Sequence, residues 1–379
     1  MSALPEAPWR DGKRYLWLLG LLVPNLPFLA YALVSLTGLD LFWWFGMIFV
    51  FALVPAVDLL AGRDTASPPD EALQWLEEDR YYRWVTYLFL PVQYAALVWA
   101  CSLLASGDLE TVDKVGLAMT LGAVAGVGIN TAHELGHKKE EHERWLARIA
   151  LAQPFYGHFY IEHNRGHHRR VATLEDPASS RVGESVYEFW PRTIVGSVIS
   201  AWNIERSRLN RRGQSHWSLR NDVLGSWALS VLLWGALVAF FGVEVLPYLL
   251  IQALVGILLL ESVNYLEHYG MKRQLDASGR LERVNASHSW NSNNIATNVL
   301  LYHLQRHSDH HANPTRRYQA LRDFKEAPVL PTGYAGMILL ALVPPLWRAV
   351  MDHRVEEHFD GDLSRANLHP RVRDRVPAR

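Results

Sequence analysis

The chain has 379 residues, of which 50% are hydrophobic, and it carries 15 Trp and a formal net charge of −1 at pH 7. This balance excludes a nucleic-acid-binding protein of the usual basic kind, because nothing supplies an overall positive field. The one cysteine, Cys101, excludes a disulfide framework and an iron–sulfur site within this chain.

Six apolar runs are each long enough to cross a bilayer, which takes about 20 residues of helix. They lie at 15–36, 41–61, 82–105, 115–132, 224–241 and 245–266. The sequence therefore predicts an all-α, polytopic integral membrane protein with six transmembrane helices, built as a single domain over residues 1–379. Two polar, histidine-rich parts, 133–222 and 267–379, are predicted to be catalytic and cytoplasmic.

Three details refine this prediction. Pro24 and Pro27 are expected to kink the first run. Gly122 and Gly126 form a GxxxG pair that favours close helix packing in lipid. The fourth run ends directly in His133, so we expect that helix to be buried and to deliver its last turn to the site. The stretch 336–350 is apolar but short and interrupted by prolines, which indicates an interfacial or packed helix and not a seventh span.

The Lys/Arg distribution predicts the orientation. The turns near 37–40, 106–114 and 242–244 carry Lys114 alone, whereas the loops on the opposite side are rich in arginine. By the positive-inside rule, both termini and all the histidine groups then face the cytoplasm, in a bacterial inner membrane.

Nine histidines form dense groups at spacings that suit metal ligation. They are His133 and His137 (i, i+4), His163, His167 and His168 (i, i+4, i+5), His307, His310 and His311 (i, i+3, i+4), and His268 at the end of the sixth run. Neutral imidazole is the commonest protein ligand for transition metals of intermediate softness. Taken alone, the HELGH segment also matches the HExxH pattern of zinc proteases, with Glu134 as candidate base.

Nine imidazoles are too many for one ion but divide sensibly over two. Zinc cannot change oxidation state, so two imidazole-bound irons with open positions imply oxygen chemistry, with copper as the alternative. Nearby acids are expected to orient the imidazoles through the other ring nitrogen: Glu134, Glu162, Glu267 and Asp309, with Asp176 and Glu184 as weaker candidates. Glu261 places a carboxylate inside the sixth run, where a charged group is costly, and the sequence assigns it no function.

The other eight histidines are interpreted as ordinary surface or packing residues. They are His142, His158, His216, His288, His303, His353, His358 and His369. His303 is the nearest of these to a ligand or proton relay, because it lies four residues before His307. Most Trp residues near the span ends are expected to anchor at the interface, and 41–51 is the first place to seek a substrate passage.

The segments HELGHK, EHNRGHH, NYLEHYG and LQRHSDHHA, in this order, closely resemble those of the membrane-bound alkane 1-monooxygenases of bacteria, integral-membrane relatives of the desaturases. The resemblance covers nearly the whole chain. It implies that the nine histidines named above hold a non-haem centre of two Fe ions. It also implies terminal (omega) hydroxylation of medium-chain n-alkanes with O2, using two electrons from rubredoxin, which an NADH-dependent rubredoxin reductase reduces.

Rubredoxin is acidic in these systems, so a basic cytoplasmic face is expected to dock it: Lys138, Lys139, Arg165, Arg169 and Arg170. The partners expected are therefore rubredoxin, an n-alkane, O2 and membrane lipids, and no nucleic acid. Three alternatives stay open: a fatty-acyl or lipid desaturase or hydroxylase with the same metals, an intramembrane zinc protease, and a metal sensor or transporter.

Overall fold

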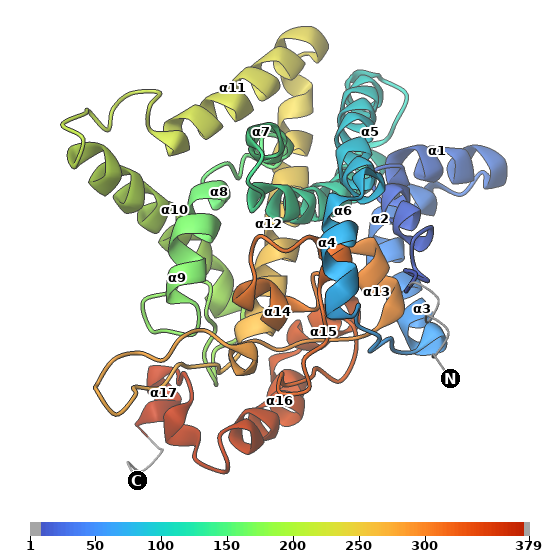
Figure 1. Cartoon of the computed structure of the whole chain (residues 1–379). Helices are drawn as coiled ribbons and strands as arrows, with labels where there is room; N and C mark the ends of the chain where they lie inside the picture. Colours follow the sequence, from blue (N-terminus) through green and yellow to red (C-terminus); the bar gives the residue numbers. More distant parts are fainter. Residues whose placement is uncertain (1–8, 375–379) are drawn as a thin grey trace, which may run out of the picture.

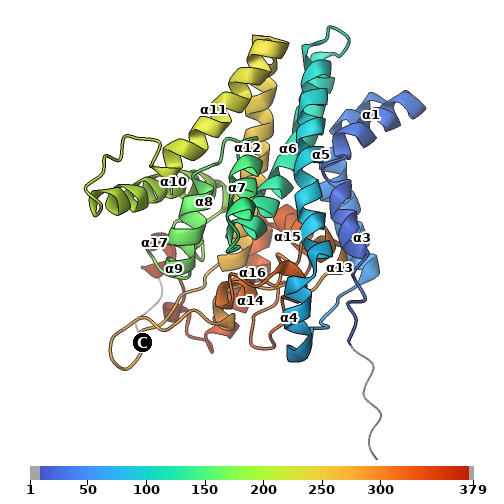
Figure 2. The ribbon, with the colours of Figure 1, turned by 45° about the horizontal axis from the view of Figure 1, so that its top comes forward.

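The computed structural model describes residues 9–374. Over that range the chain is helical, with isolated β-bridges such as Val182 with Leu368 and no β-strand (Figure 1). Long helices rise toward one end of the molecule, and the shorter helices α13 to α17 gather toward the other (Figure 2). The all-α prediction is confirmed.

The helices follow one another as a run of long apolar elements and short connecting ones. Their bounds are η1 Leu16–Leu22, α1 Leu26–Thr37, η2 Asp40–Trp44, α2 Phe45–Ile48, η3 Phe49–Leu53, α3 Val54–Ala61, α4 Asp70–Glu78, α5 Arg80–Ala105, α6 Thr111–Gly136, α7 Glu141–Ala150, α8 Phe159–Ile161, η4 Glu162–His167, α9 His168–Arg170, α10 Val186–Asn210, α11 Asp222–Phe241, η5 Val243–Val245, α12 Leu246–His268, η6 Ala286–His288, α13 Ile295–Leu300, α14 His307–Ala312, η7 Tyr318–Ala320, α15 Tyr334–Ala341, α16 Pro344–His358, η8 Leu363–Arg365 and α17 Pro370–Arg373.

Five helical stretches among the described residues are long and apolar enough to cross a membrane. They are Asp40–Ala61, Arg80–Ala105, Thr111–Gly136, Asp222–Phe241 and Val243–His268. Two bent pairs pass the same test only when each is joined: η1 with α1, bent by 69° at the segment that contains Pro24, and α15 with α16, bent by 118°. The chain is thus a multi-pass membrane protein with five to seven candidate spans.

The contact between α6 and α12 forms the centre of the bundle. A Cβ atom on Gly122 would lie 2.5 Å from Val255 Cβ, and one on Gly126 would lie 3.2 Å from Leu259 Cβ. Only hydrogen at these two positions allows the helices to approach so closely. The small-residue pair therefore packs as predicted, and α6 is buried over most of its length.

The fourth predicted span, 115–132, is shorter than the helix that forms. In the structure α6 continues to Gly136, so His133 lies inside the helix and His137 is its C-cap. An ion pair between Glu134 Oε1 and Lys138 Nζ (2.9 Å) links the last turn to the residue beyond it, which favours helix there.

Part of the segment 135–222 returns into the apolar bundle after α7. The backbone carbonyl of Gln153 accepts hydrogen bonds from Trp234 Nε1 (3.0 Å) and from Gln252 Nε2 (2.9 Å). Glu261 of α12 accepts from Tyr156 Oη (2.6 Å), and it also accepts from Thr193 Oγ1 and Asn264 Nδ2. Glu261 thus holds the returning segment and α10 against α12, because its buried carboxylate has three donors.

Candidate metal centre

Four separate elements bring the nine histidines together. His133 and His137 come from the end of α6, and His268 is the last residue of α12. The middle group lies on η4, a π-helix that continues into α9, and the last group opens α14. A π-helical turn is uncommon and is found frequently at functional sites. It replaces the regular α-helix that the i, i+4 spacing predicted for this group.

The nine rings lie in two groups. Ligand nitrogens within each group are all within 4.8 Å of one another. The five-histidine group is His133, His137, His163, His168 and His310, and the four-histidine group is His167, His268, His307 and His311. All of them are buried except His137 and His168, which are half-buried. The fold therefore gathers every histidine of the four sequence clusters.

Within each group the Nε2 atoms face one another. His310 Nε2 lies 2.9 Å from His133 Nε2 and 3.1 Å from His168 Nε2. In the other group, His307 Nε2 lies 2.9 Å from His311 Nε2 and 3.2 Å from His268 Nε2. Two imidazole nitrogens at right angles on an ion, each about 2.1 Å from it, would be about 3 Å apart. The observed spacing fits that geometry.

The protonation state of the histidine rings is also suited to binding a cation. Burial is the largest cause that lowers the pKa of His163, His310 and His311 well below the ordinary histidine value, and neighbouring histidines add to it. The rings are therefore neutral, and neutral imidazole is the form that binds metal. Among the described residues, His137 Nε2 is buried without a hydrogen-bond partner. Clustered lone pairs repel one another unless a cation lies between them, so the donor set is that of a metal site.

The acids around the rings fall into two kinds. Asp176 Oδ2 accepts a hydrogen bond from His167 Nδ1 (2.9 Å), and Glu267 Oε1 lies 3.2 Å from His307 Nδ1. Burial raises the pKa of the Asp176 carboxyl, but the charge and hydrogen bond of His167 outweigh it and bring this pKa to about 2. An acceptor at Nδ1 leaves the Nε2 lone pair free for a metal.

The remaining candidate acids pair with cations. Glu134 pairs with Lys138, Glu162 with Arg170, and Glu184 with Arg192. Arg316 Nη1 donates to both carboxylate oxygens of Asp309, at 2.6 and 2.7 Å, and the backbone N–H of Arg322 donates to Asp309 Oδ2. These ion pairs lock the segments that carry the histidines, which is a different contribution from the imidazole contact that the sequence predicted for three of them.

His303 lies outside both groups. Its ring is buried, and its Nδ1 lies 2.9 Å from the carbonyl oxygen of Tyr318. Asp176 is the residue that sequence reasoning ranked too low. It lies nine residues after His167, beyond helical spacing, and only the fold of the intervening turn brings the two together.

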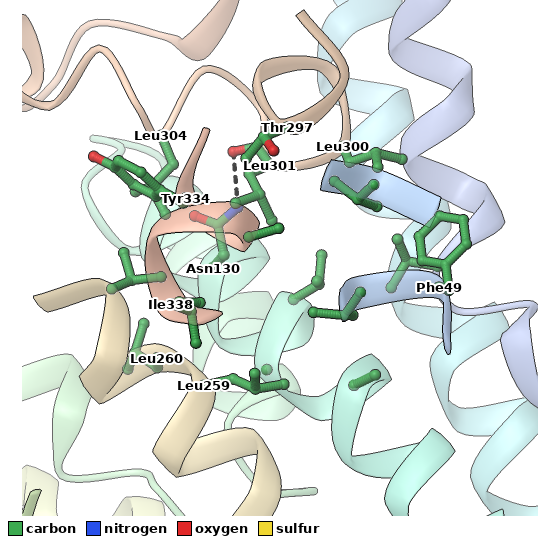
Figure 3. A pocket seen from close by; sticks show the side chains of 18 residues that line it. Phe49, Asn130, Leu259, Leu260, Thr297, Leu300, Leu301, Leu304, Tyr334 and Ile338 are labelled. Carbon is green, nitrogen blue, oxygen red and sulfur yellow. Dashed lines mark hydrogen bonds between the residues drawn. The ribbon is translucent and has the colours of Figure 1, made fainter. Parts of the chain in front are cut away.

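An apolar cavity of about 80 Å³ lies within the helical bundle (Figure 3). Its wall combines aliphatic and aromatic side chains from α6, α12, α13, α15 and the η3–α3 helix. Phe49 and Val50 belong to it, within the stretch 41–51 where a passage was sought. Few of the side chains that line the cavity are polar. One of them is Asn130, whose Nδ2 donates a hydrogen bond to the carbonyl oxygen of Leu301 (2.8 Å).

The cavity shares its elements with the histidine groups. Asn130 lines it and lies one helical turn before His133 on α6. Leu304 lines it and lies three residues before His307, and Val263 lies five residues before His268. The same segments therefore line the cavity and, three to five residues later, supply histidines to both groups.

On the polar side, a cleft of about 830 Å³ opens between η4–α9 and α10. Seven arginines line it: Arg165, Arg169, Arg170, Arg181, Arg192, Arg208 and Arg211. Asp176, which contacts His167, forms part of the same wall. Lys138 does not contribute to a basic surface as expected, because its side chain is 1% exposed and pairs with Glu134.

Comparison with known proteins places these features in a family. Residues 114–341 match the fatty acid desaturase domain family. The chain is 48% identical to alkane 1-monooxygenase 1 of Alcanivorax borkumensis over 366 residues, 96% of this chain and 90% of that protein. It is 46% identical to the alkane 1-monooxygenase of Acinetobacter baylyi (97% and 91% covered) and to that of Pseudomonas putida (98% and 93% covered). This chain therefore belongs to the alkane 1-monooxygenase family, a family of oxidoreductases, and its clustered histidines are suited to bind metal.

Proposed function

We propose that this protein hydroxylates the terminal carbon of n-alkanes, converting RH, O2, two electrons and two protons into ROH and water. The observation that carries the proposal is that the helices bearing two groups of clustered imidazoles also line an apolar cavity within the bundle. The relatives at 46–48% identity bear the name alkane 1-monooxygenase, which supports the same reaction.

The nine histidines are proposed to hold two Fe ions, five rings on one and four on the other. This division follows the two geometric groups. Two irons, when bound, would supply the redox chemistry that activates dioxygen, which no side chain can supply. Asp176 would keep the ring of His167 oriented through its hydrogen bond with Nδ1, and Glu267 would help to orient His307, whose Nδ1 lies 3.2 Å from Oε1.

The chain's own task with the substrate is positioning. A primary C–H bond has no dipole to polarise, so an alkane is held by shape and by exclusion of water. The side chains of Phe49, Val127, Leu260 and Ile338, which line the cavity, are proposed to do this. Medium-chain alkanes are the proposed substrates.

The membrane arrangement proposed is one domain with six spans, in which η1 with α1 forms one bent span and α15 with α16 does not cross. Charge supports this choice, because α16 carries Arg348, Asp352 and Arg354 as well as two glutamates. The proposed location is the bacterial inner membrane, with both termini and the histidines on the cytoplasmic side.

The proposed electron donor is rubredoxin, reduced by an NADH-dependent reductase, and its proposed dock is the arginine-lined cleft. Arg169 and Arg211 line that cleft, and neither forms an ion pair within residues 9–374. Replacing either by Gln is expected to raise the KM for rubredoxin, more so at low ionic strength. Lys325→Gln, an exposed charge away from the cleft, is the matched control. An unchanged KM in both arginine variants would rule out this dock.

The experiment that tests the function combines metal analysis with product analysis. Purified protein in lipid is supplied with octane, NADH, rubredoxin, its reductase and O2, and 1-octanol is measured. His137→Ala is expected to abolish the product, whereas His142→Ala, an exposed histidine outside both groups, leaves it. Oxidation of an acyl lipid in place of octane would identify a desaturase or lipid hydroxylase. One zinc per chain would identify the protease.

A further inference from the structure

Helix α10 has three faces with different surroundings. One is buried against η4, α8 and α12, and its residues recur every four positions: Phe189, Thr193, Ser197, Ala201 and Glu205. A second face forms one wall of the arginine-lined cleft, through residues that include Asn203 and Ser207. The third face is only partly covered by the described chain: Pro191 and Val195 are exposed, and Val198 and Trp202 are half-buried.

This third face is apolar. Pro191, Val195, Val198 and Trp202 follow one another at i, i+4, i+7 and i+11, which places them on one stripe of a helix. Val195 is 57% exposed. A stripe of this kind on an isolated helix is typical of a segment whose apolar side lies against lipid.

The stripe continues beyond the end of α10. The ring of Trp202 lies 4.9 Å from that of Trp217, in the loop that leads to α11. Trp217 is 72% exposed and Leu219 is 76% exposed. A contiguous exposed apolar patch on a folded protein marks an interaction surface. We call the patch formed by Pro191, Val195, Val198, Trp202, Trp217 and Leu219 the interfacial strip.

The strip joins directly onto a membrane span. Leu219 lies three residues before Asp222, the first residue of α11, which is a candidate membrane span. In Figure 2, α10 crosses at the foot of α11 while α11 and α12 rise together. Exposed arginines that do not line the cleft flank the same end: Arg206, Arg212 and Arg220. Aromatic residues and arginines at the end of a span are the usual contacts of lipid headgroups.

We propose that α10 and the following loop form an interfacial platform, with the strip inserted at the boundary between headgroups and acyl chains on the histidine side of the membrane. The flanking arginines contact the phosphates of anionic lipids. The segment 135–222, too polar to cross, thereby contacts the bilayer along one helix. This inference is independent of the reaction that the protein catalyses.

The platform has a consequence for the site. The opposite side of α10 holds the histidine-bearing segment, because Arg165 Nη1 pairs with Glu205 Oε1 (2.6 Å) and Arg170 Nη2 donates to Ser200 Oγ (2.5 Å). Lipid contact on one side of α10 therefore fixes the depth of η4 relative to the bilayer.

The test measures the depth of a spin label. Cys101 is the only cysteine in the sequence and is fully buried, so a nitroxide thiol reagent labels an introduced surface cysteine selectively. Val195→Cys and Leu219→Cys report the strip. Ser207→Cys, on the cleft face of the same helix, and Ser278→Cys, in a polar loop, are the matched controls. All four positions are exposed, so the substitutions leave the packing intact.

In nanodiscs of phosphatidylcholine and phosphatidylglycerol, labels at 195 and 219 are expected to relax more with O2, which enters the hydrocarbon, than with aqueous Ni-EDDA. Labels at 207 and 278 are expected to show the reverse. A water-like response at 195 and 219 would overturn the proposal. Spin–spin broadening that disappears on dilution with unlabelled protein would also overturn it, because a second copy would then cover the strip.

A second arm tests the arginines. With the label at 219, adding phosphatidylglycerol to phosphatidylcholine nanodiscs is expected to shift the O2-to-Ni-EDDA ratio upward. The double replacement of Arg206 and Arg212 by Gln is expected to remove that shift and leave the ratio in phosphatidylcholine unchanged. The same ratio with and without the anionic lipid would refute the headgroup contact.

Discussion

Asp176 provides the sharpest test of how the centre is held. Its carboxylate is 2% exposed, and Oδ2 accepts from His167 Nδ1 (2.9 Å) and from Ser179 Oγ (2.7 Å). Asp176→Asn keeps the volume but removes the charge that fixes the Nδ1–H tautomer of His167. The ring then loses the restraint that directs its Nε2 toward the four-histidine group.

The expected cost is a loss of about 10- to 100-fold in metal affinity, which is typical of such a partner and equals about 1.4–2.8 kcal/mol. Because His167 belongs to one group, the loss is expected to concern one of two ions. Metal content is measured by mass spectrometry after titration with a chelator, and 1-octanol formation is measured in parallel. The metal-to-protein ratio is expected to fall from two toward one before the second ion is lost.

Glu184→Gln is the matched control, since Glu184 is an equally buried carboxylate on the same segment but pairs with Arg192. It is expected to lower thermal stability and to keep both ions. If Asp176→Asn retained both ions at the chelator concentrations that leave wild type loaded, the role assigned to Asp176 would be refuted. Equal metal loss in both variants would indicate a general loss of structure.

Three further predictions concern packing, charge and pH. Gly122→Ala places a methyl group 2.5 Å from Val255 Cβ, and the resulting overpacking is expected to cost about 1–3 kcal/mol, seen as a lower unfolding midpoint in detergent. Glu143→Gln breaks a buried bidentate pair with Arg317 (3.0 Å on both sides) and is expected to cost about 3–5 kcal/mol in chemical unfolding. Burial lowers the pKa of His303 well below its ordinary value, so the unfolded state binds the extra proton and stability falls as pH drops below about 6.5. His303→Gln is expected to reduce this acid sensitivity, measured as the change in midpoint between pH 8 and pH 5.5.

Each of these has a control in the same chain. Gly107→Ala adds a methyl group where nothing lies within 4 Å and is expected to leave the midpoint unchanged. Glu244→Gln, on an exposed turn, is the control for loss of a carboxylate. His353→Gln, an exposed histidine, is expected to leave the acid sensitivity as in wild type. A midpoint for Glu143→Gln equal to that of its control would contradict the estimate for the buried pair.

The sequence by itself determined the fold class and the nine histidines. Apolar runs of about 20 residues have few alternatives to membrane helices, because backbone groups must pair internally in lipid. Imidazoles at i, i+3 and i+4 share a helix face, so His307, His310 and His311 could be grouped without any structure. The small residues of α6 likewise predicted close packing against another helix, and the structure identifies that helix as α12.

Only the tertiary structure decided how those parts meet. It divides the histidines into groups of five and four, which requires the end of α6 beside both η4 and α14. It gives His167 its partner in Asp176 and buries Lys138, an expected surface charge, beside Glu134. Such contacts join residues far apart in sequence or beyond helical spacing, and no local pattern encodes them, because they depend on the path of every helix between. The sequence identifies the candidate histidines, and long-range packing decides which of them lie in the same group.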